Sequence, residues 1–129
     1  MKTSVFKKLL LTAALVAAPL AGEAFAHGSM KPQHGGQVAL AGETVIELVR
    51  SGHGVTVYLS DEDQPVPAAG MTGKLIITQG GKKSDVALTS AGGNRLQAHG
   101  FKIASGAKVT VSLVSKATQE RGAVSFTAK

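Results

Sequence analysis

Val55-Thr56-Val57-Tyr58-Leu59-Ser60 is the stretch that decides the fold of this chain. Its apolar and polar residues alternate with a period of two, which is typical of a β-strand with one buried face. Ser51-Gly52-His53-Gly54 precedes it and predicts a tight hairpin, because glycine accepts the positive φ that such turns need. Residues 44–50 form the partner strand of that hairpin. The core of the fold is therefore expected to be an antiparallel pair with Val55, Val57 and Leu59 facing inward.

The same pattern repeats outward in both directions, between many glycine-rich breaks. Further short strands are expected at residues 37–40, 74–78, 83–88, 95–99, 107–114 and 121–127. In the strand at 107–114, Val109, Val111 and Leu113 are expected to face inward. About eight strands with turn signals every eight to twelve residues predict an all-β chain, an immunoglobulin-like antiparallel β-sandwich. A small Greek-key barrel is the alternative.

The beginning of the chain has the pattern of a secretory signal peptide. A lysine-containing start is followed by an apolar run at residues 9–20 and by Ala24-Phe25-Ala26, a typical cleavage site. The run of about a dozen residues is too short to cross a bilayer, which needs roughly 20. We therefore expect removal of residues 1–26, a periplasmic protein that does not span the membrane after processing, and a mature chain that begins at His27.

Removal of the signal would leave 129 − 26 = 103 residues, enough for one small domain. We divide them into a flexible segment at 27–36, which contains histidine and methionine, and a β-sandwich domain at 37–129. The chain has no cysteine, which excludes disulfides and thiolate zinc sites. Its basic residues are scattered and its aromatic residues are few, a composition that argues against nucleic-acid binding.

Five side chains are candidate metal ligands: His27, Met30, His34, His53 and His99. A free amino-terminal His27 could chelate a metal ion through its α-amine and its imidazole. His34 and Met30 lie within eight residues of it, whereas His53 and His99 stand at a hairpin tip and a strand end, where a sandwich collects its functional loops. A nitrogen-rich site binds copper(II) most tightly among the divalent first-row ions, with nickel and zinc behind it.

Simpler interpretations exist for three of these residues. His53 can be a solvated loop histidine, His99 can pack on Phe101, and Met30 can cover the edge of the core. Gly35 and Gly36 are expected to serve backbone geometry and not metal ligation. No nucleophile elbow or zinc motif is present, and no pair of carboxylates is expected to face a cleft, so we expect no enzyme.

His34-Gly35-Gly36-Gln37-Val38, followed by a β-rich stretch, resembles small exported proteins of Gram-negative bacteria that are encoded with heavy-metal efflux systems. A similar beginning precedes some periplasmic adaptor subunits of metal-exporting pumps, and residues 91–96 look like the same small family. The resemblance implies a metal-related accessory role. Among the candidate ligands, only His34 matches a histidine that recurs in that family. The architecture is also similar, more distantly, to periplasmic β-sandwich copper carriers. This chain lacks their methionine-rich loop, which favours a cupric site over a cuprous one.

Together these observations predict a non-enzymatic periplasmic protein that binds copper(II) and acts as a buffer or carrier in heavy-metal tolerance or efflux. Its partner would be a periplasmic subunit of a metal-efflux system. The alternative is an immunoglobulin-like periplasmic interaction module that binds no metal. Clustering of the histidines at one end of the domain would favour the first function, and dispersal would favour the second.

Overall fold

The computed structural model describes residues 28–129, so the expected signal peptide and His27 lie outside the described residues. Nine β-strands follow in chain order: β1 (Gln37–Ala41), β2 (Thr44–Ser51), β3 (Gly54–Asp61), β4 (Gln64–Pro65), β5 (Met71–Gln79), β6 (Lys82–Ser90), β7 (Arg95–His99), β8 (Lys108–Ser115) and β9 (Arg121–Thr127). A 3-10 helix, η1 (Ala68–Gly70), precedes β5. Within this part of the chain, no helix has the length and apolar character needed to traverse a bilayer. The expected all-β class is confirmed.

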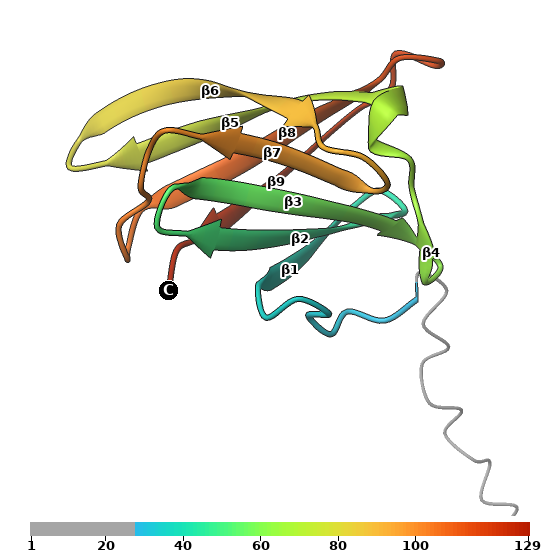
Figure 1. Ribbon diagram of the computed structural model, residues 1–129, viewed down its shortest axis with the longest axis horizontal. Coiled ribbons are helices and arrows are strands. Elements are labelled where there is room, and N and C mark those ends of the chain that lie inside the picture. Colours follow the sequence, from blue (N-terminus) through green and yellow to red (C-terminus); the bar gives the residue numbers. More distant parts are fainter. Residues whose placement is uncertain (1–27) are drawn as a thin grey trace, which may run out of the picture.

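All strand pairs are antiparallel, and eight strands follow one continuous order, β1-β2-β3-β7-β6-β5-β8-β9, with β4 paired to β3 beside that path (Figure 1). The two outermost strands, β1 and β9, lie against each other. There the side-chain amide of Gln37 donates a hydrogen bond of 2.9 Å to the carbonyl of Thr127. The sheet is therefore nearly closed into a barrel, which leaves little free edge for pairing with another chain.

The strand boundaries differ little from those expected, with one exception at β4. No strand was expected in residues 61–70, where Pro65 and Pro67 cannot donate to a central ladder. In the structure, Ser60 instead pairs with Pro65, and Asp61 pairs with Gln64. A proline is tolerated there because this two-residue strand has a sheet neighbour on one side only.

One hydrophobic core fills the space inside the curved sheet. It contains all six side chains that were expected to face inward, each at most 2 % exposed: Val55, Val57, Leu59, Val109, Val111 and Leu113. Val57 lies between Leu48 of β2 and Leu96 of β7 in the ladder. The period-two reading of β3 and β8 is therefore confirmed.

The turns gather at two ends of the barrel (Figure 1). The His53 end is made by the connections at residues 52–53, 80–81 and 100–107. The Asp63 end is made by the connections at residues 42–43, 62–63, 91–94 and 116–120. Antiparallel pairing fixes this division, because each strand runs from one end to the other.

The first prediction tests the register of β3. Val57→Asp should lower the free energy of unfolding by more than about 4 kcal/mol, because the new carboxylate would be buried with no partner. Ala87→Asp is the matched control, since Ala87 is an exposed position on β6. Thermal and urea unfolding of both variants provide the measurement. A native melting temperature for Val57→Asp would show that the register is wrong.

Candidate functional site

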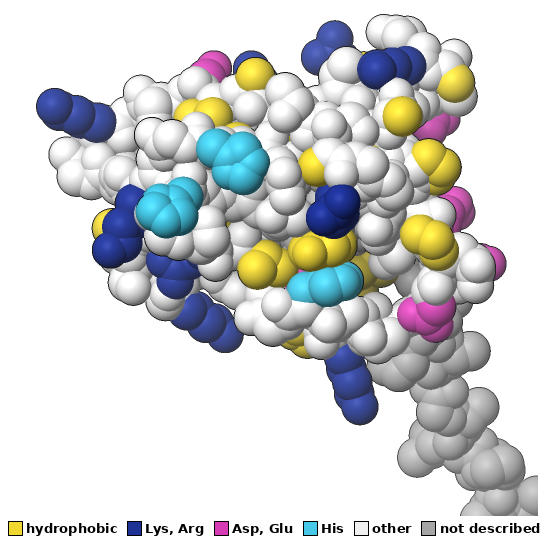
Figure 2. All heavy atoms as spheres, viewed as in Figure 1, with side chains coloured by type: hydrophobic (Ala, Val, Ile, Leu, Met, Phe, Trp, Pro, Cys, Tyr) yellow, Lys and Arg dark blue, Asp and Glu magenta, His cyan; other side chains and the backbone are white. Residues whose placement is uncertain are grey.

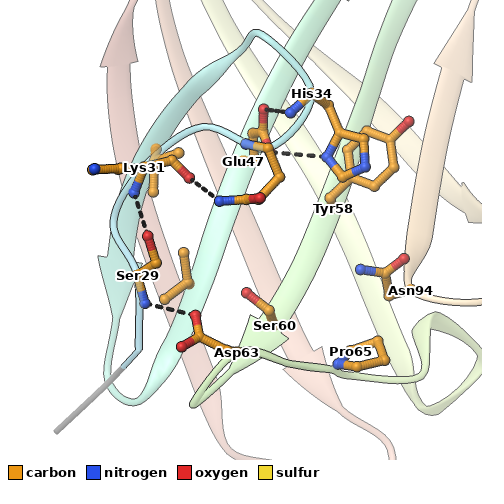
Figure 3. Close-up of a pocket in the computed structure, with 12 residues that line it drawn as sticks. Ser29, Lys31, His34, Glu47, Tyr58, Ser60, Asp63, Pro65 and Asn94 are labelled. Carbon is orange, nitrogen blue, oxygen red and sulfur yellow. Dashed lines mark hydrogen bonds and ion pairs between the residues drawn. The ribbon is translucent and has the colours of Figure 1, made fainter. Parts of the chain in front are cut away.

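Glu47 is a buried carboxylate on the outer face of the sheet. It lies in the middle of β2, beside Tyr58 of β3 in the ladder, and only 4 % of it is exposed. Its neighbours Ile46 and Leu48 point into the core. Residues 28–36, which we call the N-terminal strap, cross the outer face of β2 and bury this side chain (Figure 3).

Four hydrogen bonds from the N-terminal strap converge on the Glu47 carboxylate. The backbone N–H of Gln33 donates to Oε1 at 3.0 Å, and those of His34 and Gly36 donate to Oε2 at 2.8 and 2.9 Å. The imidazole Nδ1 of His34 lies 3.0 Å from Oε1. The two carboxylate oxygens therefore satisfy three backbone groups and one ring nitrogen, which fixes the strap on β2.

The same contacts determine the ionisation of Glu47. Burial by itself would raise the pKa of this carboxyl, because it disfavours the charged form. The hydrogen bonds from the His34 side chain and from the backbone of Gly36, His34 and Gln33 favour the charged form and bring the pKa below its ordinary value. Glu47 is thus an ionised carboxylate in a buried position.

The ring of His34 is held in one orientation. It stacks on Tyr58 with ring centroids 3.6 Å apart and planes 5° from parallel (Figure 3). Since an ionised carboxylate can only accept hydrogen bonds, the contact with Glu47 places the ring hydrogen on Nδ1. A neutral His34 therefore presents the lone pair of Nε2 away from Glu47. The side chain of His34 is 42 % exposed. The structure accordingly holds this ring in place, although it belongs to a segment that the sequence predicts to be flexible.

Gly35 and Gly36 allow the strap to approach β2. Gly35 has a φ of 75°, a left-handed conformation that glycine adopts without strain. A Cβ on Gly36 would collide with the carbonyl oxygen of Leu48 and with the side chain of Val49. These are the backbone roles expected for the two glycines.

A second carboxylate holds the beginning of the strap. The backbone N–H of Ser29 donates to Oδ1 of Asp63 at 2.7 Å. Between the two attachments lies a hollow of about 370 Å³, whose walls include Lys31, Tyr58 and Asn94. The strap therefore bridges a depression lined by both polar and apolar side chains and does not pack directly on the sheet along its whole length.

Of the other expected ligands, His53 and His99 lie apart from His34. Met30 is on the strap and 39 % exposed, His53 is exposed at the hairpin tip, and the Nε2 of exposed His99 lies 3.2 Å from the side-chain oxygen of Gln97. His99 pairs with Gly54, four residues along β3 from Tyr58, a separation of about 13 Å along the strand.

The histidine side chains are spread over this face of the molecule in Figure 2. Residues 28–129 contain no group of three histidine, cysteine or carboxylate side chains arranged to hold a metal ion. His27 lies outside the described residues. The structure thus separates His34 from His53 and His99.

Sequence reasoning missed Glu47 and Tyr58 as parts of the site. The sequence does contain one indication of the site: Glu47 is a carboxylate inside the otherwise apolar run Val45-Ile46-Glu47-Leu48-Val49. A charged residue at such a position needs a cover that supplies hydrogen bonds.

Comparison with known proteins found no relatives of this chain. The sequence matches no known protein family, no curated protein and no solved structure. The interpretation of the site therefore depends on its own geometry.

The second prediction concerns the attachment of the strap. Glu47→Gln should lower the free energy of unfolding by about 2–4 kcal/mol, because an amide nitrogen would face backbone donors in place of one carboxylate oxygen. The amides of Gln33, His34 and Gly36 should also lose protection from hydrogen exchange. Asp85→Asn is the control, since Asp85 forms an exposed ion pair of 3.7 Å with Lys74 and should change stability by less than about 1 kcal/mol. Unchanged protection in Glu47→Gln would contradict the assigned contacts.

The third prediction is a loss of stability in acid. Because the folded pKa of Glu47 lies below its unfolded value, its contribution is complete above the ordinary pKa of 4.5. That contribution is lost as the pH falls through the lower folded pKa. Urea unfolding measured from neutral to acidic pH should therefore show a steeper decline for the wild type than for Glu47→Gln. Parallel curves would contradict the lowered pKa.

Proposed function

We propose that this chain is a non-enzymatic periplasmic metal-binding protein for copper(II), a buffer or carrier in heavy-metal tolerance or efflux. His34 would be its fixed ligand, through Nε2. The observation that carries the proposal is the hydrogen bond between Nδ1 of His34 and the buried Glu47 carboxylate.

That arrangement has the form of a metal-binding histidine with its supporting carboxylate. Such histidines usually donate their second ring N–H to a carboxylate or carbonyl, which fixes the tautomer and makes the ligating nitrogen more basic. Stacking on Tyr58 adds a second constraint on the ring plane. His34 is therefore oriented before any ion arrives, which lowers the entropy cost of binding.

The donor set among the described residues fits a copper ion only in part. Residues 28–129 supply one oriented imidazole, and Met30 is the other expected ligand on the strap. The remaining nitrogen ligands would be the imidazole and α-amine of His27, which precedes Gly28 directly. A nitrogen-rich set favours copper(II), whereas the thioether of Met30 would favour copper(I).

Our proposal also includes the assignment of the fold as immunoglobulin-like and the resemblance to small exported proteins of metal-efflux systems. Strands β2, β3 and β7 would correspond to A, B and E of an immunoglobulin-like domain, and β5, β8 and β9 to C, F and G. β6 pairs with β5 along most of its length and with β7 at Thr89 and Ser90, so it would join the two sheets. This order supports the immunoglobulin-like assignment, whereas the contact between β1 and β9 supports the alternative, a small Greek-key barrel. We retain the small exported His-Gly-Gly proteins of metal-efflux systems as the proposed relatives.

The second candidate function is a periplasmic interaction module that binds no metal. The separation of His34 from His53 and His99 favours it. In that case the contact of His34 with Glu47 would serve only to fix the strap.

The fourth prediction decides between the two functions. His34→Phe preserves an aromatic ring over Tyr58 but removes both ring nitrogens, so copper(II) affinity should fall by at least about tenfold. His99→Phe removes an exposed imidazole elsewhere and should leave the affinity unchanged. Calorimetric titration of exported protein, with its start verified by intact mass, provides the measurement. Equal affinity in wild type and His34→Phe would reject the metal site at His34.

A further inference from the structure

The carboxylates concentrate at one end of the barrel, where three basic residues, Arg95, Lys116 and Arg121, also lie. The sequence has eight carboxylate residues, and Glu23 lies outside the described part, which leaves seven. Five of these belong to the Asp63 end: Glu43, Asp61, Glu62, Asp63 and Glu120. The other two are the buried Glu47 and Asp85, which pairs with Lys74.

The His53 end has the opposite character. Five basic side chains lie on or beside its connections: Arg50, Lys82, Lys83, Lys102 and Lys108. The four lysines are exposed, and the two ion pairs found in residues 28–129 involve none of the five. A guanidinium N–H of Arg50 donates to the carbonyl of Ile103 at 2.9 Å. In Figure 2 most acidic side chains lie toward the right of the view, whereas Lys and Arg side chains lie at the left and also at other places over the face.

The basic end lacks the features of a protein-binding surface. Cores of protein interfaces are enriched in aromatic residues, methionine and arginine and are depleted in lysine. Here four of the five cations are lysines, and Phe101 packs partly buried against the core. The large hydrophobic side chains exposed in the described region are Met30 and Leu40, on the strap and on β1. Long, mobile ammonium groups without an apolar anchor suit a diffuse anionic surface.

We propose that the His53 end docks the protein on a membrane surface rich in anionic lipid headgroups. Each lysine or arginine near such a surface strengthens binding by about fivefold. The acidic Asp63 end is repelled, so the domain is oriented with that end away from the lipid. The attachment of Ser29 to Asp63 at that end then faces the aqueous phase. This proposal does not depend on metal binding at His34.

A pair of charge-matched variants tests the orientation. Lys82→Gln/Lys83→Gln removes two charges from the His53 end, and Lys116→Gln/Arg121→Gln removes two from the Asp63 end. Both variants therefore have the same net charge. All proteins are compared in the same processed form, established by intact mass, because a retained apolar leader would itself bind lipid.

Vesicles of phosphatidylglycerol mixed with phosphatidylcholine are the probe, and vesicles of phosphatidylcholine alone are the lipid control. We expect wild-type binding only to the anionic vesicles, with release as salt shortens the Debye length from about 10 Å at 0.1 M. The variant at the His53 end should lose on the order of 20-fold in partitioning. The variant at the Asp63 end should bind at least as well as wild type. No binding of wild type to anionic vesicles, or equal losses in both variants, would overturn the proposal.

Discussion

A single ionised carboxylate, Glu47, lies buried in the middle of an apolar strand and has to be satisfied by hydrogen bonds. Burial of such a group without partners costs several kcal/mol, so the strand cannot exist in this form without a cover. The N-terminal strap provides that cover through three backbone N–H groups and the ring of His34. Two features of the strap serve this contact: the two glycines that let it approach β2 and the fixed ring of His34 over Tyr58.

Much of the fold could be predicted from the sequence because it depends on short-range patterns. The alternation in Val55-Thr56-Val57 and in Val109-Thr110-Val111 placed the inward faces correctly, and the glycine-rich breaks located the turns. The two-residue strand β4 was missed because its pairing depends on how the chain returns to β3 after the turn. Closure of the sheet was expected only in the alternative, a small Greek-key barrel, because the contact between β1 and β9 joins strands that are far apart in the sequence.

The candidate site was predicted only in part, for a related reason. His34 was named because it lies close in sequence to His27 and Met30 and matches the histidine of the resemblance, but its partners Glu47 and Tyr58 come from different strands. The tight hairpin predicted at residues 51–54 already implies that Glu47 pairs with Tyr58, because the turn fixes the register of a hairpin. The sequence pattern does not show that the strap places His34 over this pair. It also does not show that β7 pairs with β3, which puts His99 at the far end of β3 from Tyr58.

The central claim is that Glu47 fixes His34 with its ring hydrogen on Nδ1 and leaves Nε2 free to bind a ligand. Long-range proton–nitrogen NMR of the histidine rings at neutral pH tests this claim most directly, because it distinguishes the two tautomers. We predict a protonated Nδ1 and an unprotonated Nε2 for His34, with the Nε2 signal shifting when diamagnetic zinc is added. A ring protonated on Nε2, or an even mixture of both tautomers, would contradict the account.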